Sequence, residues 1–149
     1  MIELTKLTKR FAQHTAVDNL SFQVAPGEVL GFLGPNGAGK STTMKMLTGF
    51  LEPTAGTARV FGRDIRRETI AVQRQIGYLP EGAPCYGDMS VRAFLDFIAQ
   101  VRGYRGAEQV RRVDRVLSEL ELVAEQRQSI ETLSKGFTRR VGLAQAILH

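Results

Sequence analysis

The sequence has a single cysteine, Cys85, no tryptophan, and no apolar run long enough to cross a membrane. One cysteine cannot form an internal disulfide, and low cysteine usage fits a reducing compartment. A membrane-spanning helix needs about 20 consecutive apolar residues, and the N-terminal residues show no secretory pattern. We therefore expect a soluble, cytoplasmic protein with no transmembrane segment of its own.

The composition is that of one globular domain. The chain has 149 residues, of which 43% are hydrophobic and 23% charged, a balance that excludes disordered, collagen-like and coiled-coil proteins. The 20 basic residues outnumber the 15 acidic ones, giving a net charge of +5. Such an excess can indicate binding to nucleic acid or to an anionic membrane. Since no block of five like charges occurs, we favour a protein that binds phosphorylated ligands and has no direct contact with nucleic acid.

The first part of the chain predicts an α/β arrangement. Residues 2–7 and 20–24 alternate apolar and polar side chains, which is typical of half-buried strands. Residues 29–33 form a nearly continuous apolar run, which favours a strand buried on both faces. Further along, residues 57–61 predict another strand, whereas residues 41–50 and 67–75 predict helices.

After Pro84 the pattern becomes helical. Ser90 can cap a helix whose apolar positions run from Val91 to Val101, and the segment 103–106 interrupts it. A second helix follows, and a third begins at Ser134. We therefore divide the chain into residues 1–84, a β and phosphate-loop portion, and residues 85–149, a helical portion.

A phosphate-binding loop is the clearest motif in the sequence. Its members are Gly34, Pro35, Asn36, Gly37, Ala38, Gly39, Lys40 and Ser41, followed by Thr42. They fit G-x-x-x-x-G-K-[ST] at every fixed position. Small residues let successive backbone N–H groups converge on phosphate oxygens, and the following helix directs its positive end toward them. Lys40 can bind the β- and γ-phosphates and Ser41 can ligate Mg²⁺, so the motif predicts nucleotide binding.

Three other segments resemble one family of nucleotide-binding proteins. Leu133-Ser134-Lys135-Gly136-Phe137 resembles the Leu-Ser-Gly-Gly-Gln signature of ATP-binding-cassette (ABC) proteins, residues 76–81 resemble their Q-loop, and Phe11 stands at the place of their A-loop aromatic residue. The similarity runs along all 149 residues. Residues 78–81, 86–95 and 133–148 are similar to the subfamily of ATPases that serve ABC-2-type exporters, including drug-export and gliding-motility-like systems. The implied fold is a P-loop NTPase cassette, with N-terminal antiparallel strands and an α/β core followed by a helical subdomain.

The resemblance also implies roles for single residues. Phe11 would stack on adenine, and Ser134 and Gly136 would complete the γ-phosphate shell of a second subunit. Glu81 stands where the family has a glutamine that contacts Mg²⁺, and since a carboxylate also binds Mg²⁺ we treat it as a catalytic and metal-site candidate together with Lys40 and Ser41. From the residues alone, Phe11 would be a core aromatic, Ser134 a helix cap and Glu81 a solvated acid.

The sequence departs from the family pattern in two ways. Lys135 replaces a glycine and Phe137 a glutamine in the signature, which removes a polar contact. The Walker B strand that ends in Asp-Glu, the D-loop and the switch histidine are not found in the 149 residues, and neither His14 nor His149 matches the switch position. We therefore expect a cassette truncated before Walker B, an incomplete sheet with exposed apolar faces and edges, and no ATP hydrolysis by this chain alone.

The function implied by the resemblance is that of the ATP-binding subunit of an ABC exporter. Its cofactors would be ATP and Mg²⁺, and its partners a second ATP-binding subunit in a head-to-tail dimer and a transmembrane permease that docks on residues 85–97. It would lie on the cytoplasmic face of the membrane. Two alternatives are a soluble ABC ATPase that acts on nucleic acid or the ribosome, and a non-catalytic cassette remnant that only binds a partner.

Overall fold

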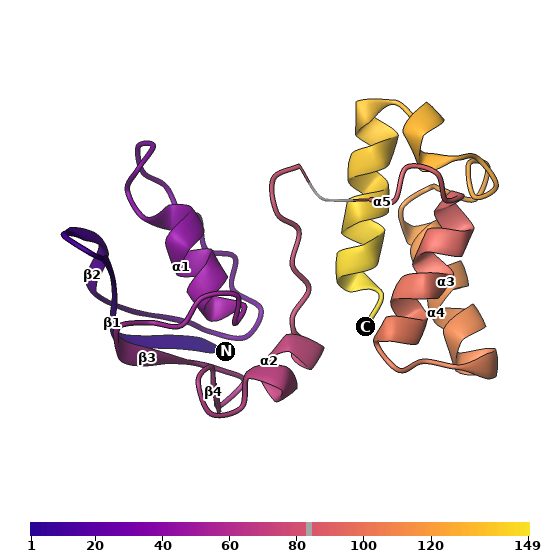
Figure 1. The fold of residues 1–149 in the computed structure, drawn as a ribbon. Coiled ribbons are helices and arrows are strands. Elements are labelled where there is room, and N and C mark those ends of the chain that lie inside the picture. Colours follow the sequence, from indigo (N-terminus) through magenta and orange to yellow (C-terminus); the bar gives the residue numbers. More distant parts are fainter. Residues whose placement is uncertain (83–84) are drawn as a thin grey trace. The chain divides into compact units, whose positions relative to one another are not determined.

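The computed structural model describes residues 1–82 and 85–149, which form two compact units, Met1–Ile76 and Gly77–His149 (Figure 1). The units divide earlier in the chain than the domain boundary expected after residue 84. That expected boundary lies outside the described residues, so the division at 84 stays a prediction. Each unit has a hydrophobic core of its own.

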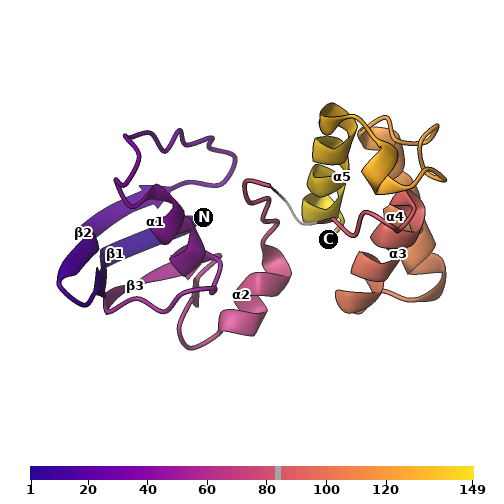
Figure 2. The ribbon, with the colours of Figure 1, turned by 45° about the horizontal axis from the view of Figure 1, so that its top comes forward.

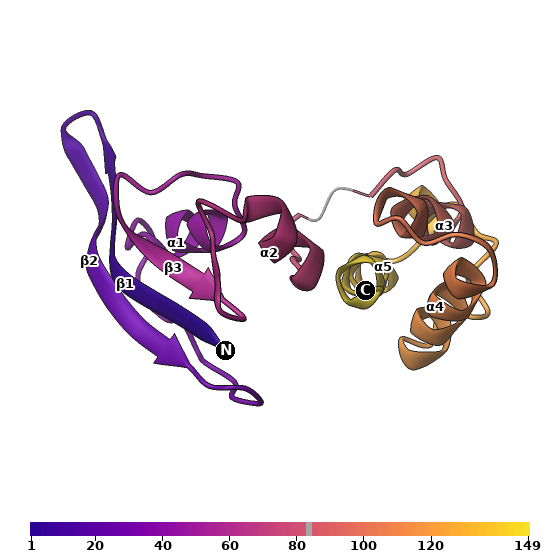
Figure 3. The ribbon, with the colours of Figure 1, turned by 90° about the horizontal axis from the view of Figure 1, so that it is seen from below.

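The first unit is built on an antiparallel sheet in the order β2-β1-β3-β4. Its strands are β1 (Ile2–Phe11), β2 (His14–Val24), β3 (Ala55–Val60) and β4 (Arg63–Asp64). The strands β1 and β2 form a hairpin that closes at the pair Phe11–His14, and β1 pairs with β3 along its other edge (Figure 3). The predicted N-terminal and middle strands are thus confirmed, whereas the two-residue β4 was not predicted.

Two helices accompany the sheet, α1 (Lys40–Leu47) and α2 (Thr69–Gln75). The first lies across one face of the sheet (Figure 2), because its buried residues Met46 and Leu47 pack among the inward side chains of the strands. The buried core of this unit consists of Leu4, Leu7, Val17, Met46, Leu47, Ala58, Val60, Ile65 and Val72. The helices predicted at residues 41–50 and 67–75 are both confirmed.

The strand predicted at residues 29–33 is wrong for this structure. The segment has no regular secondary structure and lies outside the four-stranded sheet. Val29 and Leu33 are 95% and 93% exposed, although the Phe32 ring contacts that of Phe22 at 5.8 Å between centroids. A strand exists only through ladder hydrogen bonds to a neighbour, and none of the described strands pairs with this segment.

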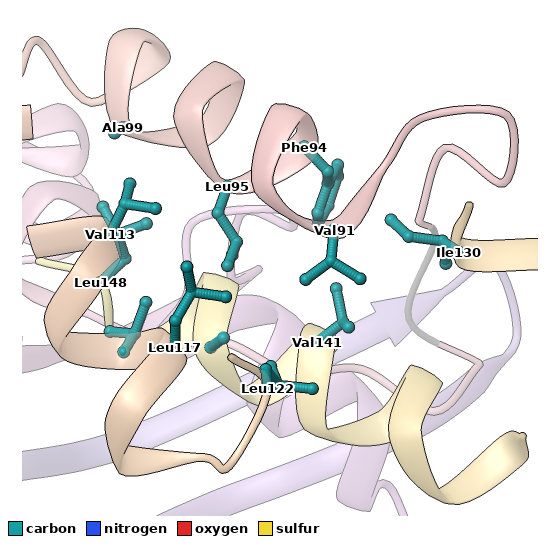
Figure 4. Close-up of a cluster of buried hydrophobic side chains, with 12 residues drawn as sticks. Val91, Phe94, Leu95, Ala99, Val113, Leu117, Leu122, Ile130, Val141 and Leu148 are labelled. Atoms are coloured by element: carbon teal, nitrogen blue, oxygen red, sulfur yellow. The ribbon is translucent and has the colours of Figure 1, made fainter. Parts of the chain in front are cut away.

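The second unit packs three helices around one core. They are α3 (Val91–Val101), α4 (Gly106–Glu119) and α5 (Lys135–Ile147), with a 3₁₀ turn, η1 (Ile130–Thr132), before the last. Leu95, Leu117 and Val141 point into the shared core from one helix each (Figure 4). The predicted caps are confirmed, because the side chains of Ser90 and Ser134 accept hydrogen bonds from the N–H groups of Ala93 and Phe137. Within the described residues, no helix has the length and apolar character needed to span a membrane.

Candidate functional site

In the phosphate-binding loop, the lysine side chain is hydrogen-bonded to the loop backbone. The Lys40 ammonium donates hydrogen bonds to the carbonyl oxygens of Gly34 at 2.5 Å and of Pro35 at 2.7 Å. A turn with a hydrogen bond from Ala38 N–H to the Pro35 carbonyl closes the loop. Residues 34–38 are exposed, so the loop backbone is accessible to a ligand. A lysine ammonium has three N–H donors, so a phosphate oxygen can bind the third one or replace a carbonyl acceptor.

Two glycines of the loop meet different structural demands. Gly37 and Gly39 have φ values of +84° and +85°, which L side chains rarely adopt. A Cβ on Gly37 would have nothing within 4 Å, whereas one on Gly39 would lie 2.2 Å from the carbonyl oxygen of Ala16 and 3.0 Å from Val17 Cγ2. Gly39 therefore brings the end of the loop directly against β2, which fixes where helix α1 begins.

The N-terminus of α1 offers unpaired N–H groups at the end of this loop. Its first turn has no acidic residue, so no carboxylate of that turn offsets the positive end of the helix dipole. Ser41 is exposed and Thr42 half-buried. The following residue, Thr43, is buried and donates its hydroxyl to the Gly39 carbonyl at 3.0 Å. This geometry suits an anion at the start of the helix and leaves the Ser41 hydroxyl open to a ligand.

Phe11 lies at the end of β1 and is 46% exposed, so its ring is not part of the core. The ammonium of Lys9 lies 5.2 Å from the ring centroid, within the range of a cation–π interaction. The same ammonium donates a hydrogen bond to the Glu52 carbonyl at 2.7 Å. The stacking role of Phe11 stays a prediction, and an exposed ring is what that role requires.

The signature residues begin α5 in the second unit. Ser134, Lys135 and Gly136 are exposed. The Ser134 hydroxyl accepts a hydrogen bond from Phe137 N–H at 3.4 Å, and a Cβ on Gly136 would have only that hydroxyl within 4 Å. The first turn thus presents a hydroxyl and backbone to solvent, with no acid in it. Such an arrangement can bind an anion.

Phe137, which stands at the place of the signature glutamine, turns toward the protein. Its ring packs against the core of the helical unit, and the Arg140 guanidinium lies 5.3 Å from the ring centroid. Arg140 also pairs with Glu121 at 2.8 Å. Position 137 therefore contributes to the packing of α5 and supplies no polar side chain at the start of the helix.

The proposed metal ligands belong to different units. Ser41 lies in the first unit and Glu81, an exposed residue, in the second. A hydroxyl and a carboxylate are both oxygen donors of the kind Mg²⁺ prefers, so the residue types fit. Across residues 1–82 and 85–149, no group of three or more His, Cys, Asp or Glu side chains could hold a metal ion. The metal and catalytic roles of Glu81 stay predictions.

Two features of these sites were missed by the sequence reasoning. One is the contact of Lys9 with Phe11. The sequence contains a signal for it, because positions 9 and 11 fall on the same face of a strand. The other is a backbone connection ahead of the signature. Ile130 N–H donates to the Met89 carbonyl and Glu131 N–H to the Gly87 carbonyl, each at 3.0 Å. Ser129 donates its hydroxyl to the same Gly87 oxygen at 2.7 Å. These contacts link the start of the helical portion to the turn that leads into Ser134.

Comparisons with known proteins identify the family. A family profile described as "ABC transporter" matches residues 17–149. "Probable multidrug ABC transporter ATP-binding protein YbhF" of Escherichia coli K12 is 38% identical over 149 residues, which are 100% of this chain and 26% of that protein. "Bacitracin transport ATP-binding protein BcrA" of Bacillus licheniformis is 34% identical over 100% of this chain and 48% of its own length. This chain thus spans about a quarter to a half of these relatives.

Solved structures of ABC transporter proteins have the same fold as this chain. A protein titled "Structure of ATP binding subunit of ABC transporter" superposes with a TM-score of 0.86 at 29% identity, over 99% of this chain and 61% of that one. The CbiO1 protein of Clostridium perfringens, with a TM-score of 0.85 at 24% identity over 99% of this chain and 61% of that one, shows the same fold. The chain therefore belongs to the ABC transporter family, as part of an ATP-binding domain.

Proposed function

We propose that this chain binds Mg-ATP through the loop at residues 34–42 and belongs to a subunit that couples ATP binding and hydrolysis to export. The observation that supports this most directly is the Lys40 ammonium enclosed by the exposed loop, at the N-terminus of a helix without acidic residues in its first turn. A polyphosphate supplies the negative charge that this arrangement lacks.

In this proposal different residues bind the phosphates, the Mg²⁺ ion and the adenine. The backbone N–H groups of residues 34 and 36–39 surround the phosphates, and Lys40 exchanges its carbonyl acceptors for β- and γ-phosphate oxygens. The hydroxyl groups of Ser41 and Thr42 lie at the start of α1, where Ser41 would hold Mg²⁺, and Glu81 is its second candidate ligand. Bound Mg²⁺ neutralises phosphate charge. The half-exposed ring of Phe11 receives the adenine.

The proposed partner proteins would contact residues of the second unit. We propose that Ser134 and Gly136 contact the γ-phosphate bound by another ATP-binding subunit, in a head-to-tail dimer. We further propose that a membrane permease docks on residues 85–97, which places the protein at the cytoplasmic face of the membrane. Tyr86 and Phe97 support this, because they are 56% and 40% exposed and their rings are in contact at 5.8 Å between centroids. The hydrogen bonds of Gly87 to Ser129 and Glu131 connect that surface to the signature turn.

Tested as a 149-residue chain, the protein should bind nucleotide weakly and should not turn it over. The expected lack of turnover has a chemical reason, because hydrolysis needs a positioned base for the attacking water. Residues 134–149 contain no carboxylate that could match the family's Walker B acids.

The test is an NMR titration of the ¹⁵N-labelled chain with Mg-ATP, in which Lys40→Ala is compared with Lys45→Ala. Lys45 is exposed in the last turn of the same helix, so both variants lose one charge from α1. We expect ATP to shift the amide signals of Gly37 and Gly39 in the wild type and in Lys45→Ala but not in Lys40→Ala. Equal shifts in all three proteins would contradict the proposal for the loop. Phosphate release at several turnovers per minute would contradict the absence of hydrolysis.

A further inference from the structure

Lys9 is held in place by the segment that follows α1. Its ammonium donates to the Glu52 carbonyl at 2.7 Å, and both of its neighbours in the chain bind Thr54. The Thr8 carbonyl accepts from Thr54 N–H at 2.9 Å, and Arg10 N–H donates to the Thr54 hydroxyl at 3.1 Å. Three successive residues of β1 are therefore hydrogen-bonded to residues 52–54, which restricts the position of the Lys9 side chain.

Lys9 contacts the exposed ring and is paired with a residue of β2 on which the phosphate-binding loop packs. Across the hairpin, Lys9 is paired with Val17, and Val17 together with Ala16 forms the surface on which Gly39 is closely packed. On its own strand, the ammonium lies 5.2 Å from the centroid of the Phe11 ring. A cation that close occupies one face of an aromatic ring and restricts its rotation.

We propose that Lys9 is a positioning residue for the nucleotide base. It holds one face of the Phe11 ring, so that adenine stacks on the opposite face, at a fixed place relative to the loop that binds the phosphates. This inference rests on the proposed function, because it requires Phe11 to receive the base.

The test separates binding of the base from binding of the phosphates. Affinities for Mg-ATP and for inorganic tripolyphosphate, which has no base, are measured by NMR titration of the full chain. We expect Lys9→Met to weaken ATP binding about two- to fivefold, the range of an exposed cation–π contact. Tripolyphosphate affinity should change only as much as in the control Lys6→Met, which removes an exposed charge from the same strand. Lys9→Arg keeps a cation and should restore ATP affinity.

A double variant tests whether Lys9 acts through the ring. If it does, Lys9→Met combined with Phe11→Ala binds ATP no more weakly than Phe11→Ala alone. The inference is overturned if the two losses add, if ATP and tripolyphosphate are weakened equally, or if Lys9→Met behaves as Lys6→Met. Should Phe11→Ala bind both ligands as the wild type does, the base platform fails while phosphate binding by the loop stands. If the wild type binds neither ligand, the proposed function fails, and this inference with it. An unchanged spectrum of each free variant shows that it is folded.

Discussion

Alanine substitutions at the two left-handed glycines of the phosphate-binding loop should have clearly different effects. Gly37 and Gly39 share the same backbone conformation, with φ of +84° and +85°, so replacing either one introduces the same strain. Left-handed backbone costs a non-glycine residue roughly 1–2 kcal/mol. This cost should be the whole effect of Gly37→Ala on folding, because a Cβ at that position has nothing within 4 Å.

Gly39→Ala adds a steric overlap. Its Cβ would lie 2.2 Å from the Ala16 carbonyl oxygen, a backbone atom of a paired strand that cannot rotate away. Either α1 must move away from β2, or the hairpin must shift. Overpacking of this kind typically costs about 1–3 kcal/mol. The expected loss for Gly39→Ala is therefore about 2–5 kcal/mol in total, which exceeds that of Gly37→Ala by the overpacking cost.

The measurement is urea unfolding followed by amide signals of β1 and β2, which report the first unit alone. Gly37→Ala should lower the unfolding midpoint modestly, and Gly39→Ala should lower it much further. It should also shift the signals of Ala16 and Val17 in the folded state. Equal midpoints for the two variants would show that the loop does not rest on β2, and would refute the close contact on which the position of α1 depends.

Two further predictions concern the helical unit. Ser90→Ala removes the cap of α3 and should lower the free energy of unfolding by about 1 kcal/mol. The control Ser118→Ala, at an exposed position inside α4, should leave that free energy nearly unchanged. Equal losses for the two variants in chemical denaturation would contradict the capping role. Burial raises the pKa of the Cys85 thiol, so less thiolate is present at a given pH and the alkylation rate should reach half its maximum at a higher pH than in the urea-unfolded chain. Identical pH profiles for the folded and unfolded chain would refute that shift.

Local signals were sufficient where a structure depends on neighbours in the sequence. The caps at Ser90 and Ser134 are examples, because a hydroxyl that precedes an apolar helix pattern needs only the N–H three residues later. The hairpin strands are also correct, since their alternation reflects one buried face. The phosphate-loop motif located Lys40, although not the two carbonyl oxygens that hold its ammonium.

Prediction failed where a structure depends on partners distant in the sequence. The apolar run at residues 29–33 reads as a buried strand, but burial and a hydrogen-bonded ladder both come from neighbouring strands, which no local pattern supplies. The contact of Gly39 with β2 likewise depends on how the loop lies on the hairpin. In the signature, the sequence shows that Phe137 removes an amide, but only the structure shows that the ring packs on the helical core.

The substitution Phe137→Gln, which restores the residue of the family signature, should therefore destabilise this chain. The glutamine gives up the apolar contact with the core and the cation–π contact with Arg140. Full burial of a phenylalanine stabilises by about 1.5–3 kcal/mol and an exposed cation–π pair by about 0.5–1 kcal/mol. Because Phe137 is only partly buried, we expect a total loss of about 1–2 kcal/mol. Phe137→Leu keeps the apolar contact and should lose less. The comparison is made by thermal unfolding followed by far-ultraviolet circular dichroism. A glutamine variant as stable as the wild type would mean that α5 does not use this ring for packing, and that the amide was lost from the signature for another reason.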